Sequence, residues 1–132
     1  MTDKAVSIAI VDDDDTFQFI TSKALRSLSN GNKIMQFSSG VEAVRYLTEH
    51  ADNPDQLPDV LLVDINMPVL DGWMVLDEFK SLKAQLKKKI AFYMVSSSID
   101  ELDVSRSKDD SAVVDYIIKP ISIEKYKELL AS

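Results

Sequence analysis

The sequence predicts a three-layer α/β fold in which five parallel strands alternate with five helices. Two observations lead to this class. Short runs of apolar and β-branched residues recur along the chain, and each is followed first by turn residues and then by a segment of helical periodicity. Strands and helices that alternate in this way form a parallel sheet covered on both faces and joined by right-handed crossovers. A single domain is therefore expected over residues 1–132.

The composition excludes several classes of function. The chain carries 15 basic and 22 acidic residues, a net charge of −7, which disfavours nucleic-acid binding by the surface as a whole. It has no cysteine and one histidine, His50, so thiolate metal sites are excluded and histidine-based sites are disfavoured. No apolar run approaches the ~18 residues of a membrane span, and the first residues do not resemble a secretion signal. We expect a cytoplasmic protein that binds neither membranes nor nucleic acid directly.

The first half of the chain predicts three strands and two helices. Strands are expected at residues 5–11, 33–37 and 60–63, the second of them at a sheet edge and the other two buried. A helix is expected from Thr16. Asp15 lies at its start, where the helix dipole favours a negative charge, and Asp14 is expected to be only a neighbour of the acidic site without a role of its own. Apolar residues at helical spacing predict the buried side of this helix: Phe17, Ile20, Ala24 and Leu28.

The second helix and the loops around it follow from turn and cap residues. Residues 30–32, Asn-Gly-Asn, end the first helix because they tolerate left-handed backbone. Ser39 and Glu42 have the spacing of a capping box and predict the start of the second helix, with Val44 and Leu47 on its inner face. The polar stretch 51–58 contains two prolines and is expected to be a loop.

The second half predicts two further strands, at residues 90–95 and 113–118, and three helices. The third helix follows Asp71-Gly72 and is expected to continue through Leu86 to the three lysines at 87–89. Ser98 and Glu101 predict a capping box for the fourth helix, and Ser122 caps the fifth. Three residues are expected to form the buried side of the fifth helix, with Leu129 adjacent to them: Ile123, Tyr126 and Leu130. Trp73 and the phenylalanines are expected in the core.

Polar side chains follow four of the five predicted strands: Asp12 and Asp13, Asp64, Ser96, and Lys119. The carboxyl ends of parallel strands lie along one edge, so these side chains are expected to converge. Three carboxylates so close together repel one another unless a cation lies among them. Oxygen ligands suit Mg²⁺, and a lysine and a hydroxyl group opposite the metal would hold a phosphoryl group.

Four motifs in the correct order make a specific signal when each lies at the end of a predicted strand. They are Val-Asp-Asp-Asp at 11–14, Asp-Ile-Asn-Met-Pro-Val-Leu-Asp-Gly at 64–72, Ser-Ser at 96–97 and Tyr-Ile-Ile-Lys-Pro at 116–120. With these motifs the chain resembles, over nearly its whole length, the receiver domain of bacterial two-component response regulators, including the stand-alone chemotaxis regulator. The resemblance implies a flavodoxin-like fold with the strand order 2-1-3-4-5, and a cis Lys119-Pro120 bond.

The resemblance also implies a role for each residue of the site. Asp64 would accept a phosphoryl group from a histidine of a partner kinase or phosphotransfer protein. The magnesium ligands would be Asp13, Asp64, the main-chain carbonyl of Asn66 and, through water, Asp12.

Lys119 would pair with a phosphoryl oxygen, Ser96 would hydrogen-bond the phosphorylated aspartate, and Tyr116 would move with it. Asn66, Ser97 and Ser98 would surround the phosphoryl group. The family pattern more often has threonine at 96, alanine at 97 and glycine at 112, where this chain has Ser96, Ser97 and Ala112. The third helix and the 51–58 loop are expected to be longer than usual.

The leading hypothesis is a phosphorylation-controlled switch, whose output surface would span residues 99–130 and could also form a homodimer. One alternative is an aspartate-nucleophile phosphatase, which would want a second acidic residue where this chain has Asn66. Another is a receiver-like binding module that works without phosphorylation, which the intact acidic, serine and lysine set disfavours. The lysines between 80 and 89 are expected to form a solvated face, with a docking patch as the alternative.

Overall fold

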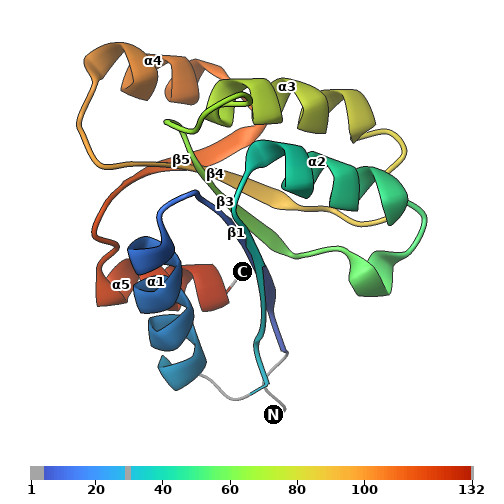
Figure 1. Cartoon of the computed structure of the whole chain (residues 1–132), viewed down its shortest axis with the longest axis horizontal. Coiled ribbons are helices and arrows are strands. Elements are labelled where there is room, and N and C mark those ends of the chain that lie inside the picture. Colours follow the sequence, from blue (N-terminus) through green and yellow to red (C-terminus); the bar gives the residue numbers. More distant parts are fainter. Residues whose placement is uncertain (1–4, 29–30, 132) are drawn as a thin grey trace.

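The computed structural model describes residues 5–28 and 31–131 and shows a five-stranded parallel sheet in the order β2-β1-β3-β4-β5 (Figure 1). Both the fold class and the strand order predicted from the sequence are confirmed. The strands are β1 (Ser7–Val11), β2 (Lys33–Phe37), β3 (Val60–Asp64), β4 (Ala91–Ser96) and β5 (Val113–Ile118). The helices are α1 (Asp15–Leu28), α2 (Gly40–Glu49), α3 (Gly72–Leu82), α4 (Glu101–Asp109) and α5 (Ile123–Leu130), with a short 3₁₀ helix at Pro54–Gln56.

The helices form one layer on each face of the sheet. Helices α2, α3 and α4 lie above the sheet in Figure 1, and α1 and α5 lie below it. One hydrophobic cluster joins α2 and α3 to the sheet, and a second joins α1 and α5 to its other face. All five residues of β3 are buried because this central strand is covered on both sides. Among the described helices, none combines the length and apolarity that a membrane crossing requires.

The predicted buried face of α1 is wrong in part. Phe17 is buried, but Ile20 is 53% exposed and Leu28 is 36% exposed. Polar residues occupy the inner side instead, since the Gln18 amide donates hydrogen bonds to the carbonyl oxygens of Ile10, Asp12 and Phe37 at 3.0–3.1 Å. These bonds offset the cost of burying the amide nitrogen, and apolar periodicity does not reveal them.

Two further apolar residues were assigned to the core incorrectly. Phe19, on the outer side of α1, is 64% exposed, and Ile123, in the first turn of α5, is 59% exposed. On the rest of the predicted inner side of α5, Tyr126 is buried and Leu130 is half-buried, while the adjacent Leu129 is fully buried.

Several predicted helix starts are confirmed by their hydrogen bonds. The Ser39 hydroxyl accepts from the Glu42 amide, the Asp71 carboxylate from the Met74 amide, and the Ser122 hydroxyl from the Lys125 amide. Gly31 has a φ of 83°, as expected for a left-handed helix stop; its neighbour Asn30 lies outside the described residues.

Three predicted helix boundaries are wrong. Helix α3 ends at Leu82, so it is not extended, and Leu86 lies in the following turn. Asp100 caps α4 in place of Ser98, since its carboxylate accepts from the amides of Leu102 and Asp103. Helix α1 begins at Asp15, one residue before the predicted Thr16, although Asp15 does lie at the helix start as expected. Asp14, predicted to be only a neighbour, caps this helix by accepting hydrogen bonds from the amides of Thr16 and Phe17.

Candidate functional site

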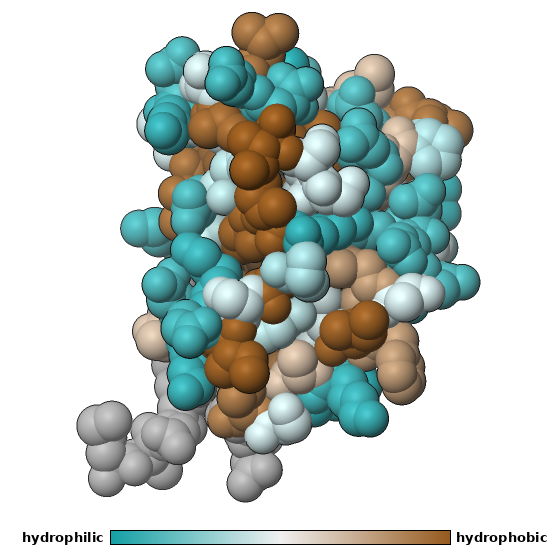
Figure 2. Space-filling view, turned by 90° about the vertical axis from the view of Figure 1, so that its left-hand side faces the viewer, coloured by the Kyte–Doolittle hydropathy of each residue, from teal (hydrophilic) through white to brown (hydrophobic). Residues whose placement is uncertain are grey.

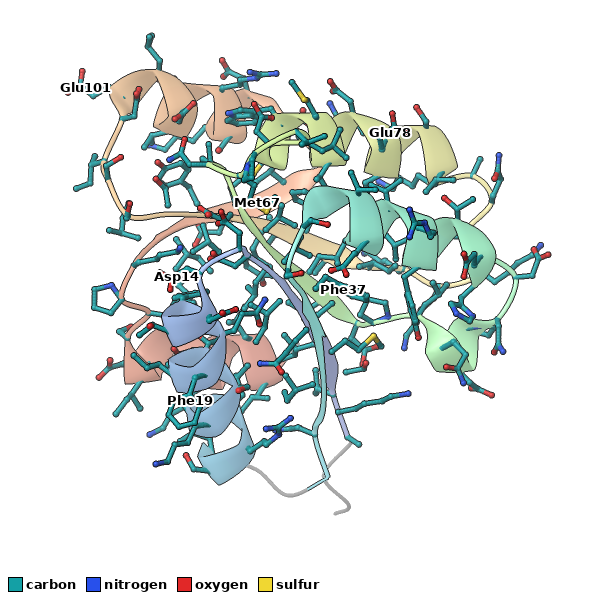
Figure 3. The ribbon with its side chains drawn as sticks, in the orientation of Figure 1. Asp14, Phe19, Phe37, Met67, Glu78 and Glu101 are labelled. Carbon is teal, nitrogen blue, oxygen red and sulfur yellow. The ribbon has the colours of Figure 1, made fainter. Side chains whose placement is uncertain are left out.

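The side chains predicted to converge do lie at the carboxyl edge of the sheet. Asp64 is the last residue of β3 and Ser96 the last of β4, while Asp12 directly follows β1 and Lys119 directly follows β5. In Figure 3 this edge lies between the labelled residues Asp14 and Met67. Backbone hydrogen bonds continue past the strands here, from the Lys119 amide to the Ser96 carbonyl (2.8 Å) and from the Asp12 amide to the Phe37 carbonyl (3.0 Å). The ends of the strands are therefore held in register.

Three carboxylates form an acidic cluster at this edge. Oxygen atoms of Asp12, Asp13 and Asp64 all lie within 4.8 Å of one another. Asp12 is 1% exposed and Asp64 is 6% exposed, whereas Asp13 is exposed. The cluster is therefore open to solvent at Asp13 and closed at the other two, an arrangement that could hold a divalent metal ion.

The acidic cluster changes the ionisation of Asp64. Burial, followed by the negative charge of Asp12, raises the pKa of Asp64 to about 6. Lys119 and the Asn66 amide oppose this shift but do not cancel it. At neutral pH the Asp64 carboxylate is ionised although burial and the charge of Asp12 disfavour this state. A cation that binds here is therefore stabilised, because it relieves the repulsion between the two carboxylates.

Lys119 supplies the positive charge of the site. Its Nζ lies 2.7 Å from Asp12 Oδ2 and 3.8 Å from Asp64 Oδ2, and 4.4 Å from the centre of the Phe17 ring. The bond between Lys119 and Pro120 is cis, as the resemblance implied. Lys119 pairs more closely with Asp12 than with Asp64, so an oxygen of Asp64 stays available for another partner.

The loop after β3 is packed tightly against the strand. The Asn66 amide donates to Asp64 Oδ1 at 3.3 Å, and the Gly72 amide donates to the Ile65 carbonyl at 2.9 Å. A Cβ atom on Gly72 would lie 2.8 Å from the Asp64 carbonyl oxygen and from Ile65 Cα, closer than non-bonded atoms approach. Glycine at this position lets the start of α3 lie against the backbone that presents Asp64.

The end of β4 is connected to β5 through Ser98. Ser96 is 1% exposed, and its hydroxyl oxygen accepts from the Ser98 amide at 3.2 Å. The Tyr116 hydroxyl donates to the Ser98 carbonyl at 2.9 Å. Ser97 and Ser98 are exposed beside this contact. The structure thus places Tyr116 against the loop that follows Ser96, and not in the acidic cluster itself.

Sequence reasoning missed a contact between α3 and α4 near the site. The Trp73 ring nitrogen donates to Asp103 Oδ1 at 3.1 Å, and the Arg106 guanidinium lies 4.1 Å from the centre of the Trp73 ring. Lys80 pairs with Asp110 further along the same two helices. The spacing of three between Asp103 and Arg106 was the available signal, since it places both on one side of a helix.

This sheet order, with carboxylates and a lysine at the carboxyl edge, defines a flavodoxin-like α/β domain with an acidic site that suits a divalent metal. The family model of the response regulator receiver domain matches residues 8–131. The chain therefore belongs to the response regulator receiver domain family, and it is a phosphoacceptor signalling module and not a catalytic enzyme.

Known proteins share this similarity at moderate sequence identity. The chain is 32% identical over 117 residues to the sensor histidine kinase CheAY of Helicobacter pylori, covering 89% of this chain and 13% of that protein's length. A two-component response regulator from Cytophaga hutchinsonii has a TM-score of 0.86 at 28% identity, with 97% and 96% of the two chains covered. The phosphorylated cyanobacterial phytochrome response regulator RcpA has a TM-score of 0.76 at 28% identity, covering 97% and 91%.

Proposed function

We propose that this protein is a phosphorylation-controlled switch in which Asp64 accepts a phosphoryl group from a phosphohistidine of a sensor kinase or phosphotransfer protein. The observation that carries the proposal is the position of Asp64. Its carboxylate ends the central strand, lies within 4.8 Å of two other carboxylates and faces Lys119 across 3.8 Å. Because such kinases phosphorylate their receivers in the cytoplasm, we place the protein there on the grounds of its family alone.

The transfer needs one nucleophilic oxygen. An Asp64 carboxylate oxygen attacks phosphorus, a P–O bond forms and the P–N bond to the donor imidazole breaks. The electron pair of that bond stays on the imidazole nitrogen, which regains a proton from water. The product is an acyl phosphate on Asp64. Because the pKa of Asp64 is about 6, the attacking carboxylate is ionised at neutral pH.

The residues present fit a bound Mg²⁺. Asp13, Asp64 and the main-chain carbonyl of Asn66 would hold it directly, and Asp12 through a water molecule. When bound, Mg²⁺ neutralises charge on the phosphoryl oxygens and on the cluster. The partly buried carboxylates and the raised pKa of Asp64 support this assignment, because both indicate unbalanced negative charge in the protein alone.

The switch would work by moving the Lys119 ammonium group from Asp12 towards a phosphorylated Asp64. This ammonium group now lies nearer Asp12 (2.7 Å) than Asp64 (3.8 Å). A phosphoryl group on Asp64 adds negative charge that draws Lys119 away from Asp12 and offers the Ser96 hydroxyl an acceptor. Moving Ser96 disturbs its hydrogen bond from the Ser98 amide, and Ser98 also holds Tyr116. The movement of Ser96 is therefore passed to β5 through Tyr116. Ser97 and Asn66 would lie beside the phosphoryl group.

The output surface would be the face formed by α4, β5 and α5. Figure 2 shows a band of hydrophobic side chains running over the side of the molecule on which α4 begins and the loop after β5 lies. The exposed apolar residues of this face are Ile99, Leu102, Val114 and Ile123. Between α4 and β5 a pocket of about 470 Å³ includes Tyr116 among its lining residues. A downstream protein, or a second copy of the chain, would bind where Tyr116 reports on the site.

The test is incubation with acetyl phosphate and Mg²⁺, followed by intact mass spectrometry. We expect the wild type to gain one phosphoryl group and Asp64→Asn to gain none. Asp77→Asn, which removes an exposed carboxylate on α3, is the matched control and should behave like the wild type. A wild type that gains no mass would support the phosphorylation-independent binding module. Continuous release of phosphate from small phosphoesters would support the phosphatase.

A further inference from the structure

A second charged region lies at the opposite edge of the sheet from Asp64. Five of the chain's 15 basic residues fall between positions 80 and 89, and no acidic residue occurs from 79 to 99. We name these residues the lysine edge: Lys80, Lys83, Lys87, Lys88 and Lys89. They occupy the end of α3 and the loop before β4, at the right-hand side of Figure 1. This positive cluster lies in a chain whose net charge is −7.

Two members of the lysine edge have structural partners. Lys80 pairs with Asp110 at the end of α4. Lys88 lies 3.0 Å from Asp59 Oδ1 and donates a hydrogen bond to the Leu57 carbonyl, also at 3.0 Å. The Lys80 pair joins α3 to the end of α4, and the Lys88 contacts fix the loop between α3 and β4 against the segment that precedes β3. The contacts of Lys88 also account for its partial burial.

The other three lysines have no such partner. Lys83, Lys87 and Lys89 are exposed, and within residues 5–28 and 31–131 no carboxylate forms an ion pair with any of them. Their ammonium groups remain available to an incoming anion. Exposure makes this cluster tolerable for the fold, since water screens the repulsion between the lysines.

A pocket lies among these lysines. Its volume is about 440 Å³, and its lining combines the cationic side chains with three apolar residues: Phe79, Leu86 and Ile90. Phe79 and Ile90 are buried, and Leu86 is half-buried in the turn that follows α3. The early end of α3 therefore creates this site, because the turn it leaves exposes Leu86 beside the lysines. An apolar floor with a positive rim suits a ligand that is apolar at one point and acidic around it.

We propose that this lysine pocket binds a short acidic peptide segment of a partner protein, with an apolar side chain in the pocket and carboxylates against Lys83, Lys87 and Lys89. A nucleic acid fits less well, because an extended polyanion would continue onto the acidic surface of the rest of the chain. The apolar floor is also of no use to a phosphate backbone.

The pocket lies where β4 begins, whereas the acidic cluster lies where the strands end. A partner held at the lysine pocket therefore leaves the acidic edge and Asp64 uncovered. Such a contact would keep a kinase or target close to the switch in either phosphorylation state and raise its effective concentration. This inference does not rest on the phosphorylation of Asp64.

The experiment measures fluorescence anisotropy of a labelled peptide in which a central phenylalanine and leucine are flanked on both sides by glutamates. The wild type should bind it saturably, and added salt should weaken the binding. The triple variant Lys83→Glu, Lys87→Glu, Lys89→Glu should bind roughly tenfold more weakly or worse. The matched control Lys23→Glu, Lys33→Glu, Lys127→Glu makes the same change in net charge at three other exposed lysines and should bind within about twofold of the wild type.

Two further arms separate the alternatives. Replacing the phenylalanine and leucine of the peptide by glycine should weaken binding roughly tenfold, and Asp64→Asn should bind like the wild type. Absence of saturable binding, or an equal loss in both triple variants, would overturn the proposal. So would a single-stranded oligonucleotide that binds the wild type more tightly than the peptide does.

Discussion

The two ends of the parallel strands carry charged clusters of opposite sign. The cluster at the carboxyl edge is acidic, and the cluster at the other edge consists of lysines. At the carboxyl edge Asp12 and Asp64 are buried, and a lysine lies against them. At the other edge Lys83, Lys87 and Lys89 are exposed. The clusters thus differ in their access to water more than in the number of their charges.

Burial determines what each cluster does. Two like charges 4 Å apart repel by about 1 kcal/mol in water and by several times more where water is excluded. The acidic edge is consequently strained in the absence of a cation, as the raised pKa of Asp64 shows, and it is prepared to respond when charge is added or removed. The lysine edge keeps its charge at little cost to the fold, which suits a surface that attracts a partner without changing shape.

The largest effect that this comparison predicts is for Lys119→Ala. The variant leaves Asp12, 1% exposed, without the ammonium group 2.7 Å away. Removing one partner of a buried pair exposes the full cost of the other, so we expect the free energy of unfolding to fall by about 2–4 kcal/mol in urea titrations without Mg²⁺. Added Mg²⁺ should restore part of the loss, and phosphorylation of this variant should no longer change the environment of Tyr116. A loss below about 0.5 kcal/mol would show that the acidic edge is screened like a surface.

An intermediate effect is expected for Asp64→Asn, with the opposite sign. The folded protein holds the pKa of Asp64 at about 6, above its ordinary value of 3.8, so between these values the folded state binds more protons than the unfolded state. Stability of the wild type therefore falls as the pH rises from about 4 to 6. The amide that replaces the Asp64 carboxylate carries no charge, so the variant escapes this loss.

Thermal unfolding measures the difference. At pH 7.5 without Mg²⁺ the Tm of Asp64→Asn should exceed that of the wild type by about 3–6 °C, and the gap should narrow as the pH is lowered towards 4. Saturating Mg²⁺ should raise the Tm of the wild type more than that of the variant. A gap that is the same at pH 4.5 and 7.5 would mean that ionisation of Asp64 does not oppose folding.

The smallest effect is expected for Lys87→Ala. Its side chain is exposed and pairs with no carboxylate among the described residues, so the free energy of unfolding should change by less than about 0.5 kcal/mol. Lys88→Ala is the matched comparison on the next residue, because Lys88 bonds both Asp59 and the Leu57 carbonyl. Urea titrations should show the larger loss for Lys88→Ala, and equal losses would contradict the division of the lysine edge into free and structural members.

The sheet was predictable because its three inner strands, β1, β3 and β4, are nearly continuous apolar runs. The run from Val60 to Val63 is buried throughout, and it places Asp64 at its end whatever the helices do. The acidic cluster followed in turn, since parallel strands bring their carboxyl ends to one edge. Cap residues such as Ser39 and Ser122 were also predictable, because their hydroxyl groups accept hydrogen bonds from amides only three residues further along the chain.

The helices were less predictable because their faces depend on tertiary partners. Gln18 is buried because its amide donates hydrogen bonds to carbonyls of β1, β2 and the loop between β1 and α1. A local sequence pattern does not predict these tertiary bonds. Ser98 does not cap α4 because the helix begins later, at Glu101, where the Asp100 carboxylate accepts from the first amides. The pocket beside Leu86 could not be predicted, because the helical spacing of apolar residues continues to Leu86 although α3 ends at Leu82.

The most direct test of the central claim is to locate the phosphoryl group itself. After reaction with acetyl phosphate and Mg²⁺, borohydride reduces an acyl phosphate on aspartate to homoserine, and peptide sequencing by mass spectrometry identifies the position. We expect homoserine at position 64 and unmodified aspartate at 12 and 13, because Asp64 alone combines the end of the central strand with an oxygen facing Lys119. Homoserine at position 12 or 13 in place of 64 would contradict it.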